Sequence, residues 1–153
     1  MSRHLSPDDY RALAEFRYQI RCFLNFSEQA ARSAGLEPQQ YVMLLAVRGL
    51  PEGQRATIRA LAERLQIRHH SAVELIDRLA HRGLVRRIRA PQDRRNVLIH
   101  LTARGERILE KLAQLRLLEL HATGPALVRA LEALIERTRE SETLPHVVHA
   151  ASG

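Results

Sequence analysis

The sequence predicts a mainly α-helical fold with one small β-hairpin, and two observations lead to this prediction. Apolar residues recur at helical spacing over most of the 153 residues. The spacing changes to alternation only between Leu84 and Leu101, where two short apolar runs flank a turn at residues 90–95. We therefore expect an α+β chain in which a helix pair is followed directly by a hairpin.

Capping and breaking residues set the expected helix boundaries. Ser6 and the proline after it begin the first helix, two aspartates suit the positive end of its dipole, and Gly35 ends it. A second helix begins at Pro38 and ends before Gly49. Further helices are expected at 58–65, at about 69–81, from Thr102 onward, and after the Thr-Gly-Pro sequence at 123–125, which should break the last helical stretch in two.

The charge of the chain favours a polyanionic partner. Lys and Arg total 24 against 17 Asp and Glu, a formal net charge of +7. Basic side chains bind nucleic acids by displacing condensed counterions. Residues 82–95 hold six arginines that are opposed only by Asp93, so the expected contact surface centres on the hairpin.

Composition also argues against several classes of protein. No apolar run is long enough to span a membrane, and residues 1–7 hold no apolar stretch of signal-peptide length, so we expect a cytoplasmic protein. Cys22 is the single cysteine, which leaves no internal disulfide and no cysteine-rich metal cage. The sequence has no Gly-rich phosphate loop, nucleophile elbow or zinc-protease motif. We therefore expect neither an enzyme nor a cofactor.

The helix pair at 58–81 and the hairpin after it have the order of a winged helix-turn-helix domain. In such a domain the second helix enters the major groove, where its amino-terminal end meets base edges and phosphates. An arginine at the hairpin tip, at 93–95, suits insertion into a narrow minor groove. Asp93 either orients one of these arginines or caps the turn. These features predict double-stranded DNA as the partner.

Two segments resemble the MarR family of bacterial regulators. Residues 68–79 and 82–87 are similar to that family's recognition helix and first wing strand. Residues 93–105 match its wing signature, D-x-R followed by an alternating strand and L-T-x-x-G, and the element order is similar from about Asp8 to Arg139. The resemblance implies a homodimer that binds palindromic promoter DNA, often as a repressor released by a small aromatic or anionic effector.

A single MarR-like chain over residues 1–153 is therefore expected. Within it, residues 36–101 would form the winged DNA-binding region, 6–35 and 102–140 a helical dimerisation region, and 141–153 a tail. The dimer has independent support, because a winged domain of this size cannot bury all the leucines and phenylalanines of the flanking helices.

The resemblance and the helix positions assign candidate residues to two sites. Arg95 matches the family's wing arginine, and His70 and Ser71 lie at the start of the recognition helix. The candidate DNA-binding residues are Arg68, His69, His70, Ser71, Glu74, Arg78, Arg86, Arg87, Arg89, Asp93, Arg94 and Arg95. The candidate effector-binding residues, assigned by their position on the first two helices, are Phe16, Arg17, Ile20, Tyr41 and Leu45, with Arg17 as a carboxylate partner.

Three alternatives remain open. Oxidant sensing through Cys22 does not fit the register of the family's peroxide sensors, whose cysteine lies nearer the start of the first helix. Metal sensing needs converging ligands, and the eight histidines form no carboxylate–histidine cluster at ligand spacing. A sequence-tolerant architectural DNA-binding protein would carry the same charge, and the ratio of specific to non-specific affinity separates it from a regulator.

Overall fold

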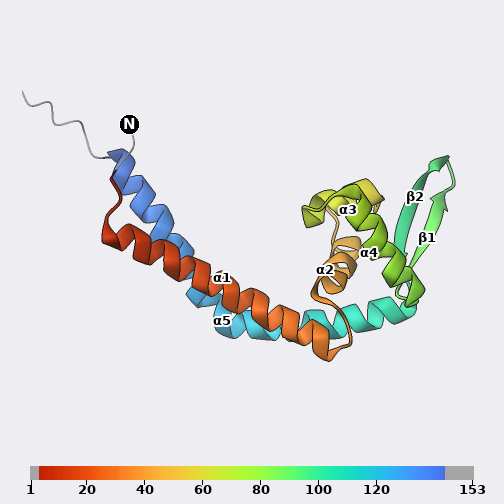
Figure 1. The fold of residues 1–153 in the computed structure, drawn as a ribbon, viewed down its shortest axis with the longest axis horizontal. Coiled ribbons are helices and arrows are strands. Elements are labelled where there is room, and N and C mark those ends of the chain that lie inside the picture. Colours follow the sequence, from red (N-terminus) through yellow and green to blue (C-terminus); the bar gives the residue numbers. More distant parts are fainter. Residues whose placement is uncertain (1–3, 144–153) are drawn as a thin grey trace, which may run out of the picture. The chain divides into compact units, whose positions relative to one another are not determined.

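The computed structural model describes residues 4–143, except for the side chains of Arg94 and of residues 141–143. Its elements (Figure 1) are α1 (Pro7–Ser33), α2 (Pro38–Arg48), α3 (Ile58–Leu65), α4 (His69–His81), β1 (Val85–Ala90), β2 (Asp93–Leu101) and α5 (Ala103–Thr143). This helical architecture with one antiparallel hairpin confirms the predicted fold class. Of the expected tail, residues 141–143 belong to α5, and 144–153 lie outside the described residues.

The chain divides into two compact units. Residues 26–117 form the first, which contains α2, α3, α4, the hairpin and the adjoining parts of the two long helices; we call it the winged unit. The second comprises the start of α1 and the end of α5, residues 4–25 and 118–143 of the described chain, and we call it the helical unit.

In the helical unit, the start of α1 is fixed by a reciprocal cap and by an ion pair to α5. The Ser6 amide donates to Asp9 Oδ2 at 2.8 Å, and the Asp9 amide donates to Ser6 Oγ at 3.3 Å. Asp9 is buried, and its Oδ1 accepts a 2.8 Å bond from Arg137 Nε on α5. The Asp9 carboxylate, through this hydrogen bond, raises the pKa of Arg137. The helix start expected at Ser6 is therefore confirmed.

The expected break at residues 123–125 is wrong, because α5 continues through it and Pro125 lies inside one helix. Proline removes one backbone donor, so the carbonyl of His121 loses its usual partner four residues later. Gly124 makes the continuation easier, since a residue with no Cβ avoids the clash with the following proline ring that disfavours helical conformation. One helix therefore replaces the two that the sequence predicted.

The helix-turn-helix lies in the winged unit, with the boundaries expected from the sequence. Thr57 Oγ1 accepts a 3.2 Å bond from the Ala60 amide and so caps α3. Gln66 closes α3 in the left-handed conformation at φ 55°, and only two residues separate it from α4. Gly83, at φ 70°, ends α4 where a side chain would be strained.

The hairpin is a two-stranded antiparallel sheet whose base is held by the start of α3. Register pairs Val85 with Leu101 and Arg87 with Ile99, and it shifts at the tip, where Ala90 pairs with Asp93. The Ile99 amide donates to the Ala56 carbonyl at 2.9 Å, which anchors β2 on the segment before α3. Val85 and Ile99 are buried, so the sheet face that carries them is the one that packs on the unit.

The first turn of α5 is pressed against the turn between α4 and β1. Thr102 Oγ1 donates to the Gly83 carbonyl at 2.6 Å, and the Thr102 amide donates to the Leu84 carbonyl at 3.0 Å. The Gly105 amide in turn donates to Thr102 Oγ1 at 3.0 Å, which confirms Thr102 as a helix cap. A Cβ added at Gly105 would lie 2.1 Å from the Leu84 carbonyl oxygen. The glycine of the L-T-x-x-G signature is therefore required by this contact.

Candidate nucleic-acid interface

The first turn of α4 presents its polar side chains outward. The buried side chains Ala72, Leu75, Ile76 and Leu79 fix one face of the helix in the core. Arg68 occupies the N-cap position without a side-chain cap, and His69 and His70 are exposed. Ser71 is half-buried. Amide groups at a helix start attract phosphate, so this end of α4 suits a DNA contact.

The later turns of α4 are tied to the start of α2. Arg78 Nη1 lies 3.8 Å from Glu37 Oε2, and both side chains are more than half exposed. Arg82 Nη1 donates to Gln40 Oε1 at 2.9 Å, and Gln40 is buried. Glu74, one turn earlier on α4, is exposed. An ion pair as exposed as that of Arg78 contributes little to stability, so Arg78 remains able to reach DNA.

The hairpin tip is shaped by Asp93. Its Oδ1 accepts a 3.0 Å bond from the Arg95 amide, and its Oδ2 accepts a 2.9 Å bond from Asn96 Nδ2. Of the two roles considered for Asp93, the structure shows the turn cap. Arg95, Arg86 and Arg89 are exposed, whereas the side chain of Arg94 lies outside the described residues.

Arg87 of the hairpin forms an ion pair with α4. Its Nη2 donates to Asp77 Oδ1 of α4 at 2.5 Å, and its side chain is 35% exposed against 58% for that of Asp77. The pair joins the helix to the first strand. Sequence spacing alone did not indicate it, because the two residues lie ten positions apart on different elements.

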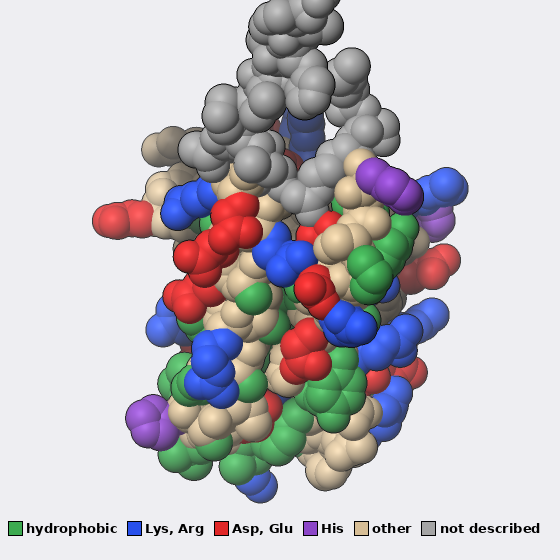
Figure 2. Space-filling view, turned by 90° about the vertical axis from the view of Figure 1, so that its left-hand side faces the viewer, with side chains coloured by type: hydrophobic (Ala, Val, Ile, Leu, Met, Phe, Trp, Pro, Cys, Tyr) green, Lys and Arg blue, Asp and Glu red, His purple; other side chains and the backbone are tan. Residues whose placement is uncertain are grey.

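The net positive charge of the chain comes from the winged unit. Residues 26–117 hold 17 Lys and Arg against 9 Asp and Glu, an excess of eight, while the rest of the chain holds 7 against 8. Figure 2 shows one face of the molecule, on which acidic and basic side chains are interspersed. Arg55, Arg59 and Arg64, at or in α3, are exposed in the winged unit and were not among the predicted residues. The available signal was their place in the first helix of the pair, for Arg59 and Arg64, or just before it, for Arg55.

The candidate effector residues fall in both units. Phe16 and Ile20 are half-buried and Arg17 is exposed, all on α1 in the helical unit. Tyr41 and Leu45 lie on α2 in the winged unit. An effector site formed by these five residues remains a prediction.

Tyr41 and Leu45 have contrasting surroundings. Tyr41 is buried, and burial raises the pKa of its phenol while the charge of Arg116 opposes this rise. Leu45 is 43% exposed and lines a groove of about 400 Å³ between α2 and α5. Arg48, Glu106 and Glu110 also line it, so the groove combines an apolar floor with charges of both signs.

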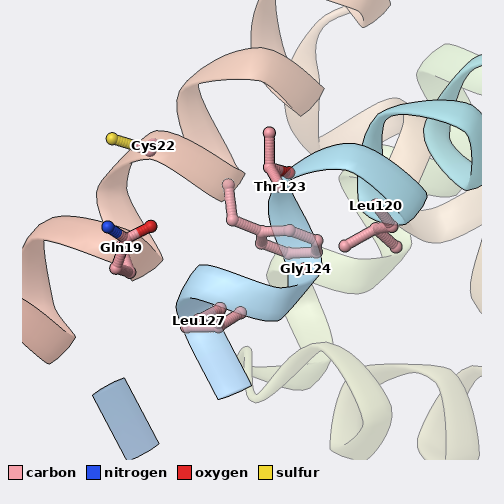
Figure 3. Close-up of a pocket in the computed structure, with 7 residues that line it drawn as sticks. Gln19, Cys22, Leu120, Thr123, Gly124 and Leu127 are labelled. Atoms are coloured by element: carbon pink, nitrogen blue, oxygen red, sulfur yellow. The ribbon is translucent and has the colours of Figure 1, made fainter. Parts of the chain in front are cut away.

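Cys22 lies on α1 beside a small cavity of the helical unit. The cavity measures about 10 Å³, room for one water molecule, and Figure 3 shows Gln19 and Cys22 of α1 opposite Leu120, Gly124 and Leu127 of α5. Cys22 is exposed, and its hydrogen bond to Tyr18 raises the pKa of that phenol.

No three His, Cys, Asp or Glu side chains of residues 4–143 converge as a metal site would require. No helix in that range has the length and apolar character needed to cross a membrane.

A helix pair followed by a hairpin, with the start of the second helix exposed, is the arrangement of winged helix-turn-helix proteins, and this chain has it. Residues 34–96 match the model of the MarR family. This part of the chain is similar to the MarR family of transcriptional regulators, as the resemblance predicted.

Two relatives are themselves regulators. The chain is 30% identical over 98 residues to a Thauera aromatica protein assigned as the transcriptional regulatory protein for the hcr operon. This match covers 64% of this chain and 57% of the relative. It is 29% identical over 115 residues to the HTH-type transcriptional regulator YkoM of Bacillus subtilis. This match covers 72% of this chain and 71% of YkoM. The chain therefore spans little more than half of the first relative.

Solved structures share the fold. AbsC of Streptomyces coelicolor, a MarR family transcriptional regulator, superposes with a TM-score of 0.69 at 22% identity over 91% of this chain and 99% of AbsC. A variant of E. coli MarR in complex with operator DNA superposes with a TM-score of 0.62 at 24% identity. The match covers 80% of this chain and 89% of the variant. CouR of Rhodococcus jostii RHA1, bound to p-coumaroyl-CoA, superposes with a TM-score of 0.54 at 27% identity. The match covers 78% of this chain and 80% of CouR.

Proposed function

We propose that this protein is a sequence-specific DNA-binding regulator, a repressor that binds palindromic promoter DNA as a homodimer and is released by a small ligand. The observation that carries the proposal is the exposed first turn of α4 next to an arginine-rich hairpin, in a unit with an excess of eight positive charges. Charge of this density favours DNA over an uncharged partner.

The contacts are assigned by position. His69, His70 and Ser71 face the major groove, and Arg95 enters the flanking minor groove. Arg86 and Arg89 of the hairpin contact phosphates. The exposed arginines of α3 join the phosphate contacts. Residues 36–101 thereby form the DNA-binding region. A variant of E. coli MarR, which shares the fold, is solved in complex with operator DNA, and this supports DNA as the partner.

The homodimer follows from apolar surface that one chain leaves uncovered. Leu117 and Leu118 of α5 are 69% and 72% exposed, and Tyr10 and Tyr18 of α1 are both 60% exposed. Surface of this kind on long helices is covered by a partner, and a two-fold axis is the commonest arrangement. Residues 6–35 and 102–140 form the dimerisation region in this proposal. Light scattering at micromolar concentration should give twice the chain mass, and a clean monomer would contradict it.

The effector is proposed as a small aromatic or anionic molecule. The complex of CouR with p-coumaroyl-CoA supports a ligand of this class in a structural relative. Phe16, Arg17, Ile20, Tyr41 and Leu45 are its proposed contacts. An effector of this kind should release bound DNA, and Arg17→Ala should raise the concentration required.

Selection of genomic DNA fragments by the purified protein tests the central proposal. The best fragment and a scrambled version of it are then compared at one fixed salt concentration. A palindromic fragment bound about a thousandfold better than its scrambled control is expected of a specific regulator. Equal binding to both would instead indicate a sequence-tolerant architectural protein.

A further inference from the structure

The hairpin and α4 are joined along the chain by a short turn. Only Arg82, Gly83 and Leu84 separate α4 from β1, and the middle residue is a glycine with φ 70°. This link and the backbone bond from Ile99 to Ala56 hold the base of the hairpin, and side-chain contacts to α4 contribute further to the angle between β1 and that helix. The Asp77–Arg87 hydrogen bond of 2.5 Å is such a contact, because it joins the third turn of α4 to the third residue of β1.

The position of Arg87 in the sheet fits this role. Its strand partner is Ile99, and alternation places it on the same face as Val85, the face that packs on the winged unit. Arg86 points to the opposite face. Arg87 is therefore directed toward α4, where Asp77 accepts its hydrogen bond.

A carboxylate at position 77 is unexpected in a surface that binds a polyanion. Asp77 is 58% exposed on the helix proposed to enter the major groove, where a negative charge repels phosphates. The hydrogen bond from Arg87 compensates part of this negative charge. Two nearby arginines have other partners, since Arg78 lies 3.8 Å from Glu37 of α2 and Arg82 donates to Gln40.

We propose that Asp77 and Arg87 form a lock that fixes the angle between the recognition helix and the wing, so that Arg87 is a positioning residue and not a phosphate contact. The proposal rests on the proposed DNA-binding function and deepens it. The lock holds α4 and Arg95 of the wing in the arrangement that adjacent grooves require before the protein meets DNA. The free-energy cost of ordering the wing is then not incurred on binding.

Asp77→Ala tests the lock because the two possibilities predict opposite signs. Loss of a negative charge alone should strengthen DNA binding, whereas loss of the lock should weaken it by about threefold to tenfold. Glu63→Ala is the matched control, since Glu63 is also exposed on a helix of the winged unit and its removal changes the net charge equally. The control should bind as tightly as the parent or slightly tighter. Asp77→Glu, which keeps the carboxylate, should retain most of the affinity.

Arg87→Ala and the double variant complete a mutant cycle. The lock predicts that the double variant is little weaker than either single variant, because each removes the same interaction. A phosphate contact predicts instead that Arg87→Ala lowers the slope of log affinity against log salt by about 0.9. Additive losses with that change of slope, or Asp77→Ala binding as tightly as Glu63→Ala, would overturn the proposal.

A measurement without DNA separates failure of the lock from failure of the proposed function. Hydrogen exchange of the amides in residues 85–90 should be faster in Asp77→Ala than in Glu63→Ala, at unchanged melting temperature. Equal exchange in the two variants would refute the lock whether or not the protein selects DNA. Absence of selective DNA binding by the parent protein, together with faster exchange in Asp77→Ala, would refute only the proposed function.

Discussion

Replacing Gly105 by alanine should destabilise the winged unit through a single steric contact. The added Cβ would lie 2.1 Å from the Leu84 carbonyl oxygen and 3.0 Å from its carbonyl carbon, whereas ordinary contacts begin at 3.4 Å. The oxygen belongs to the backbone, so no side-chain movement can relieve the overlap. It also accepts the Thr102 amide hydrogen bond at 3.0 Å, which a shift of the backbone would weaken.

The expected loss follows from three contributions. Overpacking costs about 1–3 kcal/mol, and a weakened hydrogen bond adds about 1 kcal/mol. Alanine in a helix regains about 0.5–1 kcal/mol relative to glycine. The free energy of unfolding should therefore fall by about 1–3 kcal/mol, and the melting temperature by roughly 3–10 °C for a chain of this length.

Thermal unfolding followed by circular dichroism measures this change. Arg107→Ala is the control, because Arg107 is exposed in the same turn of α5 and its truncation should change stability by less than about 0.5 kcal/mol. A melting temperature of Gly105→Ala equal to that of the control would refute the close approach of α5 to Leu84.

Three further predictions test other features. Arg95→Ala should weaken operator binding by about 1–3 kcal/mol without dissociating the dimer; unchanged affinity in a titration would remove the wing from the mechanism. Pro125→Ala should stabilise the protein by about 1–3 kcal/mol, since it restores a donor for the His121 carbonyl within α5, and an unaltered melting temperature would argue against a continuous helix. The raised pKa of the buried Tyr41 phenol means that the stability it contributes is complete below about pH 10 and lost as pH rises through the folded value. Urea unfolding at pH 8 and pH 10.5 should thus show a larger loss for the parent than for Tyr41→Phe, and equal losses would contradict the assigned environment.

Much of the winged unit could be predicted because its signals are local. Thr57, Gly83 and Thr102 act through bonds to residues close in sequence or through their own backbone angle, so a single sequence reveals them. The exposed start of α4 likewise follows from the apolar spacing of its other face. These elements together define the helix pair and the hairpin.

The features that sequence reasoning missed depend on contacts between distant elements. The Asp77–Arg87 and Arg78–Glu37 pairs require the angle between packed elements, which helical periodicity does not contain. At Pro125 the local rule for proline gave the wrong answer, because the helix tolerates one missing hydrogen bond when a glycine precedes the ring. Local preference was outweighed there by the continuity of a long helix.

The net positive charge of residues 26–117 has a consequence for the time needed to find a promoter. An excess of eight charges on one unit attracts any duplex, so encounters approach about 10⁸–10⁹ per molar per second at low salt. Such non-specific contacts permit sliding along DNA before the operator is reached. At physiological salt the attraction extends only about 8 Å. The speed of the search should therefore fall as ionic strength rises.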